Sequence, residues 1–245
     1  MIRLQARSHY CRTVKNTLSH PKTMAGRPFV TYGIIIANVA VWLGVNTFLN
    51  TTRELNLFLL TYGVVPLLIV NNVNLISLIT HMFVHVNFFH ILLNMYALFL
   101  FGRELEEAIN SLRFALLYFV SGVVASLFHV LYFVLFLSVD CSLAVRPLPA
   151  VCTIPAIGAS GAIFGVMAGY AVFFPRRRLF ALLYFIPLAA PAYLIILGYA
   201  VLQTLFMLAT PFSSVAYTAH VGGFLAGLII SAVFRLTMVR YLEFR

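Results

Sequence analysis

The sequence predicts an all-α integral membrane protein with six transmembrane helices. Of its 245 residues, 62% are hydrophobic and only 9% are charged, and the mean hydropathy is +1.01. No soluble domain could hide so much apolar surface, and apolar runs of about 20 residues, the length that crosses a bilayer, recur along the whole chain. The formal net charge is +10, but the basic residues stand at the ends of these runs, so they indicate membrane topology rather than nucleic-acid binding.

Six spans are expected in order, over residues 29–49, 83–101, 114–139, 160–174, 182–209 and 215–236. Residues 1–28 carry six basic residues and no acid, so we expect a basic flank on the cytoplasmic side of the membrane. An organelle presequence has the same acid-poor composition and stays an alternative. Residues 237–245 form a short cytoplasmic tail in this layout, which leaves residues 29–236 as one six-helix membrane domain.

Two apolar stretches are not expected to cross the membrane as one complete helix. Residues 55–70 are apolar, but Gly63 and Pro66 interrupt them, so we expect an element that lies in the membrane interface. The fourth span, at about 1.5 Å per residue, is too short to cross about 30 Å of hydrocarbon. Ser160, at its start, is therefore expected to lie below the membrane surface, under a cavity that opens to the outer side.

The positive charges support this layout. With both termini inside, 14 of the 16 Lys and Arg residues lie on the inner side, and Arg53 and Arg146 lie outside. Counting residues 55–70 as a seventh span would erase this bias. The layout also brings the polar residues of the second, fourth and sixth spans to the outer half of the membrane.

Polar side chains within the spans are candidates for function, because burying them in a membrane is costly. Ser160 follows Gly158 at a helix start, where unpaired N–H groups attract negative charge, so it has the surroundings of an acyl-transfer nucleophile. Close helix packing by Gly161, Gly165 and Gly169 is the alternative for this stretch. The polar residues within or at the start of the spans are Ser160, His220, His81, His85, His90 and Asn94.

His220 is the expected partner of Ser160. Gly223 and Gly227 follow it at i+3 and i+7, so its helix could approach the glycine face of the fourth span closely enough for a Ser160–His220 hydrogen bond. A histidine that bonds across helices for structure alone is the alternative. All six acids fall in loops or flanks, so a Ser-His dyad is expected instead of a triad.

The second-span residues have two expected roles. His90 and Asn94 are i, i+4 neighbours and could donate to an oxyanion together with the Ser160 N–H group. His81 and His85 are expected to be structural, through hydrogen bonds to the outer loop. A zinc site is disfavoured because this segment has no H-E-x-x-H pattern, acid or cysteine, and we expect no metal or cofactor.

Cys141 and Cys152 both fall in the outer loop between the third and fourth spans. A disulfide between them would need an oxidising compartment. Two free thiols are the interpretation that we favour.

Taken together, these residues resemble the rhomboid family of intramembrane serine proteases, over about residues 78–230. The matching pieces are the His81, His85, His90, Asn94 series, Gly102 with Glu104 and Glu106, the G-x-S-G of residues 158–161, and His220 with Gly223 and Gly227. The resemblance implies that Ser160 is the nucleophile and His220 the base, that His90 and Asn94 hold the oxyanion beside Gly158, and that Phe164 packs by His220. Where many members have Trp-Arg in the first outer loop, this chain has Ile76-Ser77, which puts the anchoring of that loop in question.

The resemblance implies hydrolysis of a peptide bond in or near a transmembrane helix of another membrane protein, with water entering from the outer side. Substrates with helix-weakening residues and a small side chain before the scissile bond are expected, and the fifth span, loosened by Pro187 and Pro191, is the expected lateral gate. The expected surroundings are the lipid bilayer of a cell membrane, without a nucleic-acid partner. A non-catalytic relative that binds transmembrane clients is the alternative function, and a transporter is disfavoured because no charge falls at mid-membrane.

Overall fold

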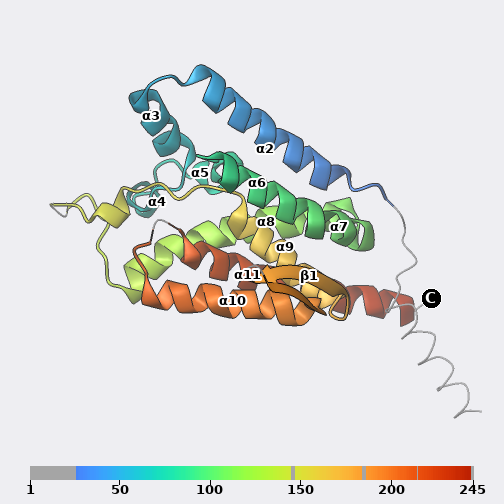
Figure 1. Cartoon of the computed structure of the whole chain (residues 1–245). Coiled ribbons are helices and arrows are strands. Elements are labelled where there is room, and N and C mark those ends of the chain that lie inside the picture. The colour runs from blue at the N-terminus through green and yellow to red at the C-terminus, as the bar shows by residue number, and fades with distance from the viewer. Residues whose placement is uncertain (1–25, 145–146, 184–185, 214, 244–245) are drawn as a thin grey trace, which may run out of the picture.

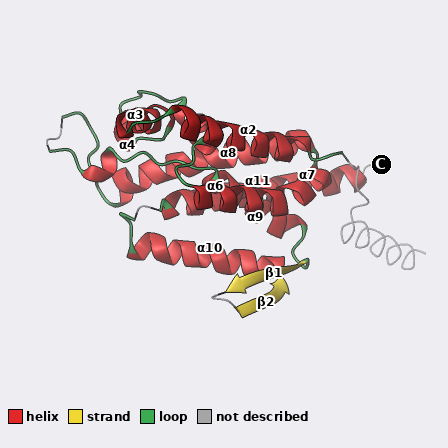
Figure 2. Ribbon diagram, turned by 45° about the horizontal axis from the view of Figure 1, so that its top comes forward, coloured by secondary structure: helices red, strands yellow, loops and turns green. Residues whose placement is uncertain are grey.

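The computed structural model describes residues 26–144, 147–183, 186–213 and 215–243. Most of the expected N-terminal flank, together with Arg146 and Arg245, lies outside the described residues. The described chain is a bundle of roughly aligned helices with a two-stranded hairpin at one end (Figures 1 and 2). The helices and strands are α2 (Phe29–Phe48), α3 (Thr52–Tyr62), α4 (Pro66–Val70), α5 (Ser77–Thr80), η1 (His81–Phe83), α6 (Phe88–Ala97), η2 (Leu98–Gly102), α7 (Arg103–Ile109), α8 (Ser111–Leu131), η3 (Tyr132–Phe136), η4 (Ala150–Cys152), α9 (Ser160–Phe173), β1 (Arg178–Leu183), β2 (Ile186–Pro191), α10 (Ala192–Ala209) and α11 (Tyr217–Glu243).

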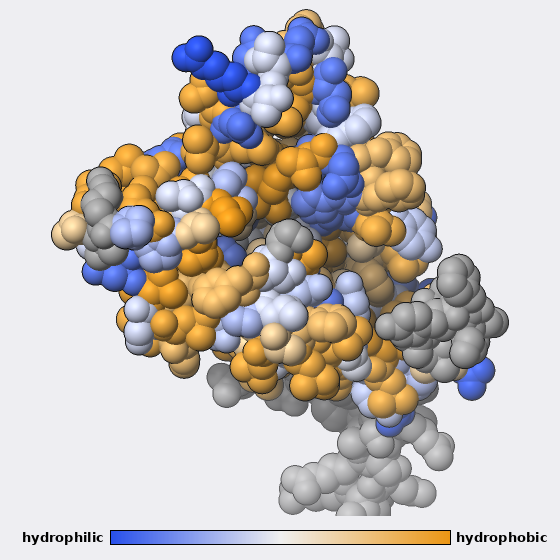
Figure 3. All heavy atoms as spheres, turned by 60° about the vertical axis from the view of Figure 1, so that its left-hand side comes forward, coloured by the Kyte–Doolittle hydropathy of each residue, from blue (hydrophilic) through white to orange (hydrophobic). Residues whose placement is uncertain are grey.

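Within the described residues, five helical stretches are long and apolar enough to cross a membrane: Phe29–Phe48, Phe88–Ile109, Ser111–Phe136, Ala192–Ala209 and Tyr217–Met238. Large apolar side chains on these helices are exposed, and apolar residues cover large parts of the face seen in Figure 3. Such a surface suits contact with lipid rather than water. The chain is therefore a multi-pass membrane protein, and α9, at 14 residues, is shorter than the five.

The apolar run over residues 55–70 breaks where the sequence predicts. α3 ends before Gly63, and α4 begins at Pro66, whose ring suits the first position of a helix. Between them, Val64 pairs with Ala156 through two backbone hydrogen bonds of 2.8 and 2.9 Å. This pair ties the segment after α3 to the loop that precedes Ser160.

The second span begins later than predicted. Helix α6 begins at Phe88, not at Phe83, because the Asn87 side chain accepts a hydrogen bond from the His90 N–H group at 2.8 Å and caps the helix. The preceding residues form the 3-10 turn η1 and an extended stretch at Val84. His81 therefore lies in η1 and His85 in the extended stretch before α6, so the two residues do not share a helical face.

The predicted start of the fifth span is wrong. Residues 178–191 form an antiparallel hairpin in which Arg178 pairs with Pro191 and Leu183 with Ile186, and helix α10 begins only at Ala192. Proline has no N–H group for a helical hydrogen bond, so Pro187 and Pro191 stop a helix from forming across this stretch. The prolines therefore precede α10 and cannot loosen it from within.

Small residues let α8, α9 and α11 pack closely. A methyl group added to Gly161 would lie 2.6 Å from the Ala125 Cβ atom of α8, and one added to Gly223 would collide with the Gly161 carbonyl oxygen. Gly227 likewise contacts the Gly165 backbone. The predicted approach of the two glycine faces is confirmed, and ten consecutive residues of α9, from Gly161 to Tyr170, are buried.

The carboxylate of Glu106 fixes the start of α2. It is 1% exposed and accepts hydrogen bonds from the backbone N–H groups of Val30 and Thr31, at 3.0 and 2.7 Å. It also accepts from the hydroxyls of Thr31 and Ser111, at 2.7 and 2.6 Å. An acid at a helix N-terminus satisfies unpaired donors and complements the helix dipole, so Glu106 holds α2 against the rest of the bundle.

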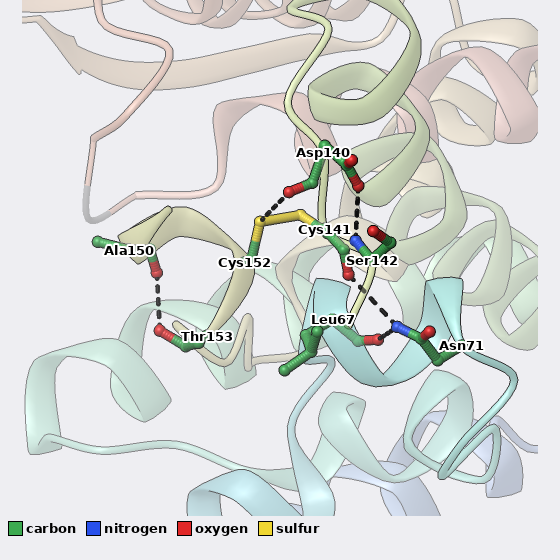
Figure 4. The surroundings of a disulfide bond; sticks show 8 residues. All are labelled: Leu67, Asn71, Asp140, Cys141, Ser142, Ala150, Cys152 and Thr153. Carbon is green, nitrogen blue, oxygen red and sulfur yellow. Dashed lines mark hydrogen bonds between the residues drawn. A yellow bond between two sulfur atoms is a disulfide. The ribbon is translucent and has the colours of Figure 1, made fainter. Parts of the chain in front are cut away.

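The expectation of two free thiols is wrong, because Cys141 and Cys152 form a disulfide (Figure 4). The loop after α8 folds back so that their Cα atoms lie 5.4 Å apart, within the range that a disulfide bridges. The amide of Asn71 donates to the carbonyl oxygens of Leu67 and Cys141, at 2.7 and 3.3 Å. The disulfide loop is thereby tied to the end of α4.

Candidate active site

Ser160 is the first residue of α9, and the loop before it is held from both sides. Gly158 has φ +109°, a conformation that side chains other than glycine rarely adopt, and its N–H group donates to the His81 carbonyl oxygen at 2.9 Å. Two residues earlier, Ala156 pairs with Val64. The first N–H groups of α9 have no partner within the helix, so this fixed loop presents Ser160 beside free donors.

The structure brings Ser160 and His220 together. His220 lies one turn into α11, and its Nε2 atom is 2.8 Å from the Ser160 Oγ atom. Ser160 is half-buried, whereas His220 is 9% exposed. A hydroxyl within hydrogen-bond reach of an imidazole nitrogen is the arrangement in which the ring can take the hydroxyl proton.

Two rings, those of Phe164 and Tyr199, form a stack with the His220 ring. The ring of Phe164, one turn after Ser160, lies 4.5 Å from the His220 ring at an interplanar angle of 13°. The ring of Tyr199, from α10, stacks on the Phe164 ring at 5.2 Å and an interplanar angle of 23°. Phe164 thus packs by His220 as the sequence resemblance implies, and the stack restricts how the imidazole can turn.

His90 and Asn94 lie one turn apart on α6 and line the same cavity as Ser160. One Asn94 N–H group donates to the His90 carbonyl oxygen at 2.7 Å, which leaves the second amide N–H group for another acceptor. The His90 Nε2 atom lies beside Gly158, only 2.6 Å from where a methyl group on that residue would be. Both side chains can therefore reach the region next to the Ser160 N–H group.

His81 and His85 contact the loop before Ser160 instead of the cavity. The His85 Nε2 atom accepts from the Ala159 N–H group at 3.4 Å, and the His85 ring meets the His90 ring edge to face at 4.8 Å. The His81 Nδ1 atom bonds the Ser77 carbonyl oxygen at 2.9 Å. Ser77 belongs to the pair Ile76-Ser77 that departs from the family pattern, and this bond joins it to the residue one turn later within the α5–η1 segment.

A cavity of about 740 Å³ lies over Ser160. Its walls come from α6, from α9, from the loop that precedes Ser160 and from Tyr199 of α10. Ser160, His90, Asn94 and His220 all line it, among mostly apolar side chains. This arrangement could admit an extended peptide with water, and it presents a nucleophile, a base and several donors to it.

In the described part of the chain, no carboxylate bonds the candidate dyad. Glu104 accepts from the Tyr170 hydroxyl at 2.6 Å and pairs with Arg177 at 2.9 Å. Asp140 accepts from the Ser142 N–H group, and this hydrogen bond lowers the pKa of its carboxyl group. Glu54 accepts from Thr51 at the start of α3, which lowers its pKa in the same way. These acids hold helix ends and loops and leave His220 without an acidic partner.

Sequence reasoning missed Gln203. Its Oε1 atom lies 2.7 Å from the His220 Nδ1 atom, and its side chain is 4% exposed. The signal was available, because Gln203 is an uncharged polar residue inside an otherwise apolar span, and such residues are candidates for function. His129 of α8, whose Nδ1 atom is 2.6 Å from the Thr218 hydroxyl, was missed as well.

The chain is similar to known proteins over most of its length. A family model described as "Rhomboid domain" matches residues 72–237, more than half of the chain. The chain is also 32% identical over 154 residues to "Rhomboid protein 1, mitochondrial" of Saccharomyces cerevisiae. This alignment covers 63% of the chain and 40% of the yeast protein, so the chain spans less than half of that relative's length.

Proposed function

Because the chain belongs to the rhomboid family, we propose that it is an intramembrane serine endopeptidase that cleaves transmembrane helices of other proteins with a Ser160–His220 dyad. The observation that carries the proposal is the 2.8 Å hydrogen bond between these side chains, beside a cavity lined by α6, α9 and the loop that precedes Ser160. A packing serine would need neither the imidazole partner nor the cavity. The name of the yeast relative describes that protein as mitochondrial.

In the proposed mechanism, His220 Nε2 takes the proton from Ser160 as the Oγ atom attacks the peptide carbonyl carbon. The oxyanion that forms accepts hydrogen bonds from the Ser160 N–H group, the free Asn94 N–H group and His90, beside the Gly158 backbone. The carbon–nitrogen bond then breaks, and His220 returns the proton to the leaving amine. In the second half of the reaction, His220 takes a proton from a water molecule as its oxygen attacks the acyl-enzyme carbonyl carbon. The ester bond then breaks, and His220 returns the proton to the Ser160 Oγ atom.

The substrate must unwind to reach Ser160. Peptide bonds in a helix are shielded by their own hydrogen bonds, so helices with weakening residues and a small side chain before the scissile bond are the proposed substrates. The cavity walls from α6 and α10 are the proposed route of lateral entry. The gate therefore rests on how α10 sits against the bundle and not on prolines within it.

The proposed topology counts α9 as a sixth, short transmembrane element at the centre of the bundle. Residues 29–236 form the membrane domain, between a basic flank over residues 1–28 and a tail over residues 237–245. We propose a cell membrane with both termini cytoplasmic. The mitochondrial relative favours a mitochondrial membrane as the alternative, and fractionation of cells that express the tagged chain separates the two.

The test is cleavage of a model transmembrane peptide in proteoliposomes. A helix interrupted by Gly and Ser should be cut by the wild type and left intact by Ser160→Ala, while an uninterrupted poly-Leu helix should resist both. Binding of the interrupted helix without cleavage by either protein would favour the alternative, a non-catalytic relative that retains transmembrane clients. Equal cleavage by wild type and Ser160→Ala would assign the reaction to another residue or a contaminant.

A further inference from the structure

We propose that Gln203 is a positioning residue that fixes the tautomer and orientation of His220, the place that an acid occupies in a Ser-His-Asp triad. The inference rests on the proposed proteolytic function. Its starting point is that both ring nitrogens of His220 have partners, Ser160 at 2.8 Å on Nε2 and Gln203 at 2.7 Å on Nδ1. The three side chains come from α9, α11 and α10, and no acid is among them.

The tautomer matters because a neutral imidazole has one N–H group and one bare nitrogen. If the Gln203 carbonyl oxygen accepts the Nδ1–H group, Nε2 is bare and can accept the Ser160 proton. In the other tautomer, Nε2 carries the proton and cannot act as the base. A neutral amide oxygen selects the productive tautomer without placing a charge in the membrane.

The surroundings of Gln203 raise the cost of losing this bond. Gln203 and His220 both border a second cavity of about 270 Å³ between α10 and α11, lined otherwise by mostly apolar side chains such as Leu197 and Phe224. Without Gln203, an Nδ1–H group that faces these side chains would be a buried donor without a partner. Gln203 removes that penalty and makes the productive tautomer the stable one.

Helix α10 holds His220 at a second point. Tyr199 precedes Gln203 by four residues, so both lie on the same face of α10. Tyr199 presses Phe164 onto the imidazole face, while Gln203 bonds its edge. This part of α10 must therefore stay against α11 during the reaction, whatever movement of α10 admits the substrate.

Imidazole 15N NMR tests the bond without requiring activity. The protein is labelled at its histidines in micelles, and the His220 signals are assigned by their loss in His220→Ala. Wild type should show a protonated Nδ1 and a bare Nε2. Gln203→Met, which keeps the side-chain length without the amide, should shift His220 toward the other tautomer, and Gln203→Glu should retain the Nδ1-protonated form. A wild-type His220 protonated on Nε2, or no change in Gln203→Met, would overturn the inference.

The functional arm uses the rate at which a fluorophosphonate probe labels Ser160. Gln203→Met should lower the maximal labelling rate about tenfold to a hundredfold and leave the probe's half-saturating concentration unchanged, because the base is impaired and the cavity is not. Gln203→Glu should recover most of the rate. Thr204→Val is the matched control, since the Thr204 hydroxyl bonds only the Ala200 carbonyl oxygen of its own helix among the described contacts, and it should label at the wild-type rate.

The two arms separate the two proposals. Labelled wild type with an unaffected Gln203→Met variant would overturn the role of Gln203 and leave the protease proposal standing. Wild type that is folded but unlabelled would remove the protease proposal, and the positioning role with it, even where NMR finds the predicted tautomer.

Discussion

Single residues set the geometry around Ser160, and Gly158 is the most constrained of them. Its positive φ bends the loop so that its N–H group meets His81 and its Cα atom faces the His90 ring. No other residue type combines this backbone with the space that His90 needs. Gly158 therefore couples the loop before Ser160 to the proposed oxyanion donors.

Gly158→Ala should damage both stability and reactivity. The new methyl group would lie 2.6 Å from the His90 Nε2 atom, and alanine is strained at the φ of +109° that this position has. We expect a loss of about 1–3 kcal/mol in the free energy of unfolding and slower probe labelling of Ser160. Gly198→Ala is the control, because a methyl group there meets open space, and it should unfold at or above the wild-type midpoint. Equal behaviour of the two variants would contradict the role assigned to Gly158.

At this scale, the sequence predicted which residues lie together at the candidate site better than it predicted where the helices begin. Ser160, His220 and Phe164 could be found because a motif and a helical spacing mark them. Gln203 could not be paired with His220, because the contact depends on how α10 leans on α11 after the hairpin, and no local spacing encodes that angle. The predicted start of the second span at Phe83 was wrong because the Asn87 cap delays the start of the helix to Phe88.

Helices α8, α9 and α11 form the rigid frame of the candidate site. Their small residues allow backbone contact, and this contact sets the distance between the start of α9 and the first turn of α11. The Ser160–His220 distance is thus a consequence of helix packing. The sequence predicted the contact between α9 and α11 from their glycines. It also predicted a helix over residues 182–191, where Pro187 and Pro191 disfavour a helix and the chain forms a hairpin.

Gly223→Ala should push α11 away from α9. The added methyl group collides with the Gly161 carbonyl oxygen, so α11 must shift away from α9. Overpacking of this kind costs about 1–3 kcal/mol of unfolding free energy, and the shift should weaken probe labelling more than the stability loss alone explains. Gly44→Ala on α2, where a methyl group meets nothing, serves as the control. Wild-type labelling in a folded Gly223→Ala variant would show that the dyad does not depend on this contact.

Across the whole molecule, the loops that follow α3, α4 and η3 form a connected cap at one end of the bundle. The Cys141–Cys152 disulfide, the Asn71 amide and the Val64–Ala156 pair join the segments on either side of the candidate site. Composition and charge predicted the membrane class and the apolar stretches. They could not predict the disulfide, because a separation of 11 residues does not say whether a loop folds back on itself.

Removing the disulfide should loosen this cap. Replacing both cysteines by serine should lower the free energy of unfolding by about 2–4 kcal/mol, because the reduced chain gains conformational freedom when it unfolds. Reducing agent should lower the wild-type midpoint and leave the double variant unchanged. Alkylation of both thiols in folded, unreduced wild type would show that the bond is absent.

The central claim is that Ser160 is activated by His220, and labelling by a fluorophosphonate probe tests it most directly. In detergent, the purified wild-type protein should be labelled, and mass spectrometry should map the adduct to Ser160. The Ser160→Ala and His220→Ala variants should remain unlabelled. An unlabelled wild type that is shown to be folded, or labelling that persists in Ser160→Ala, would contradict the claim.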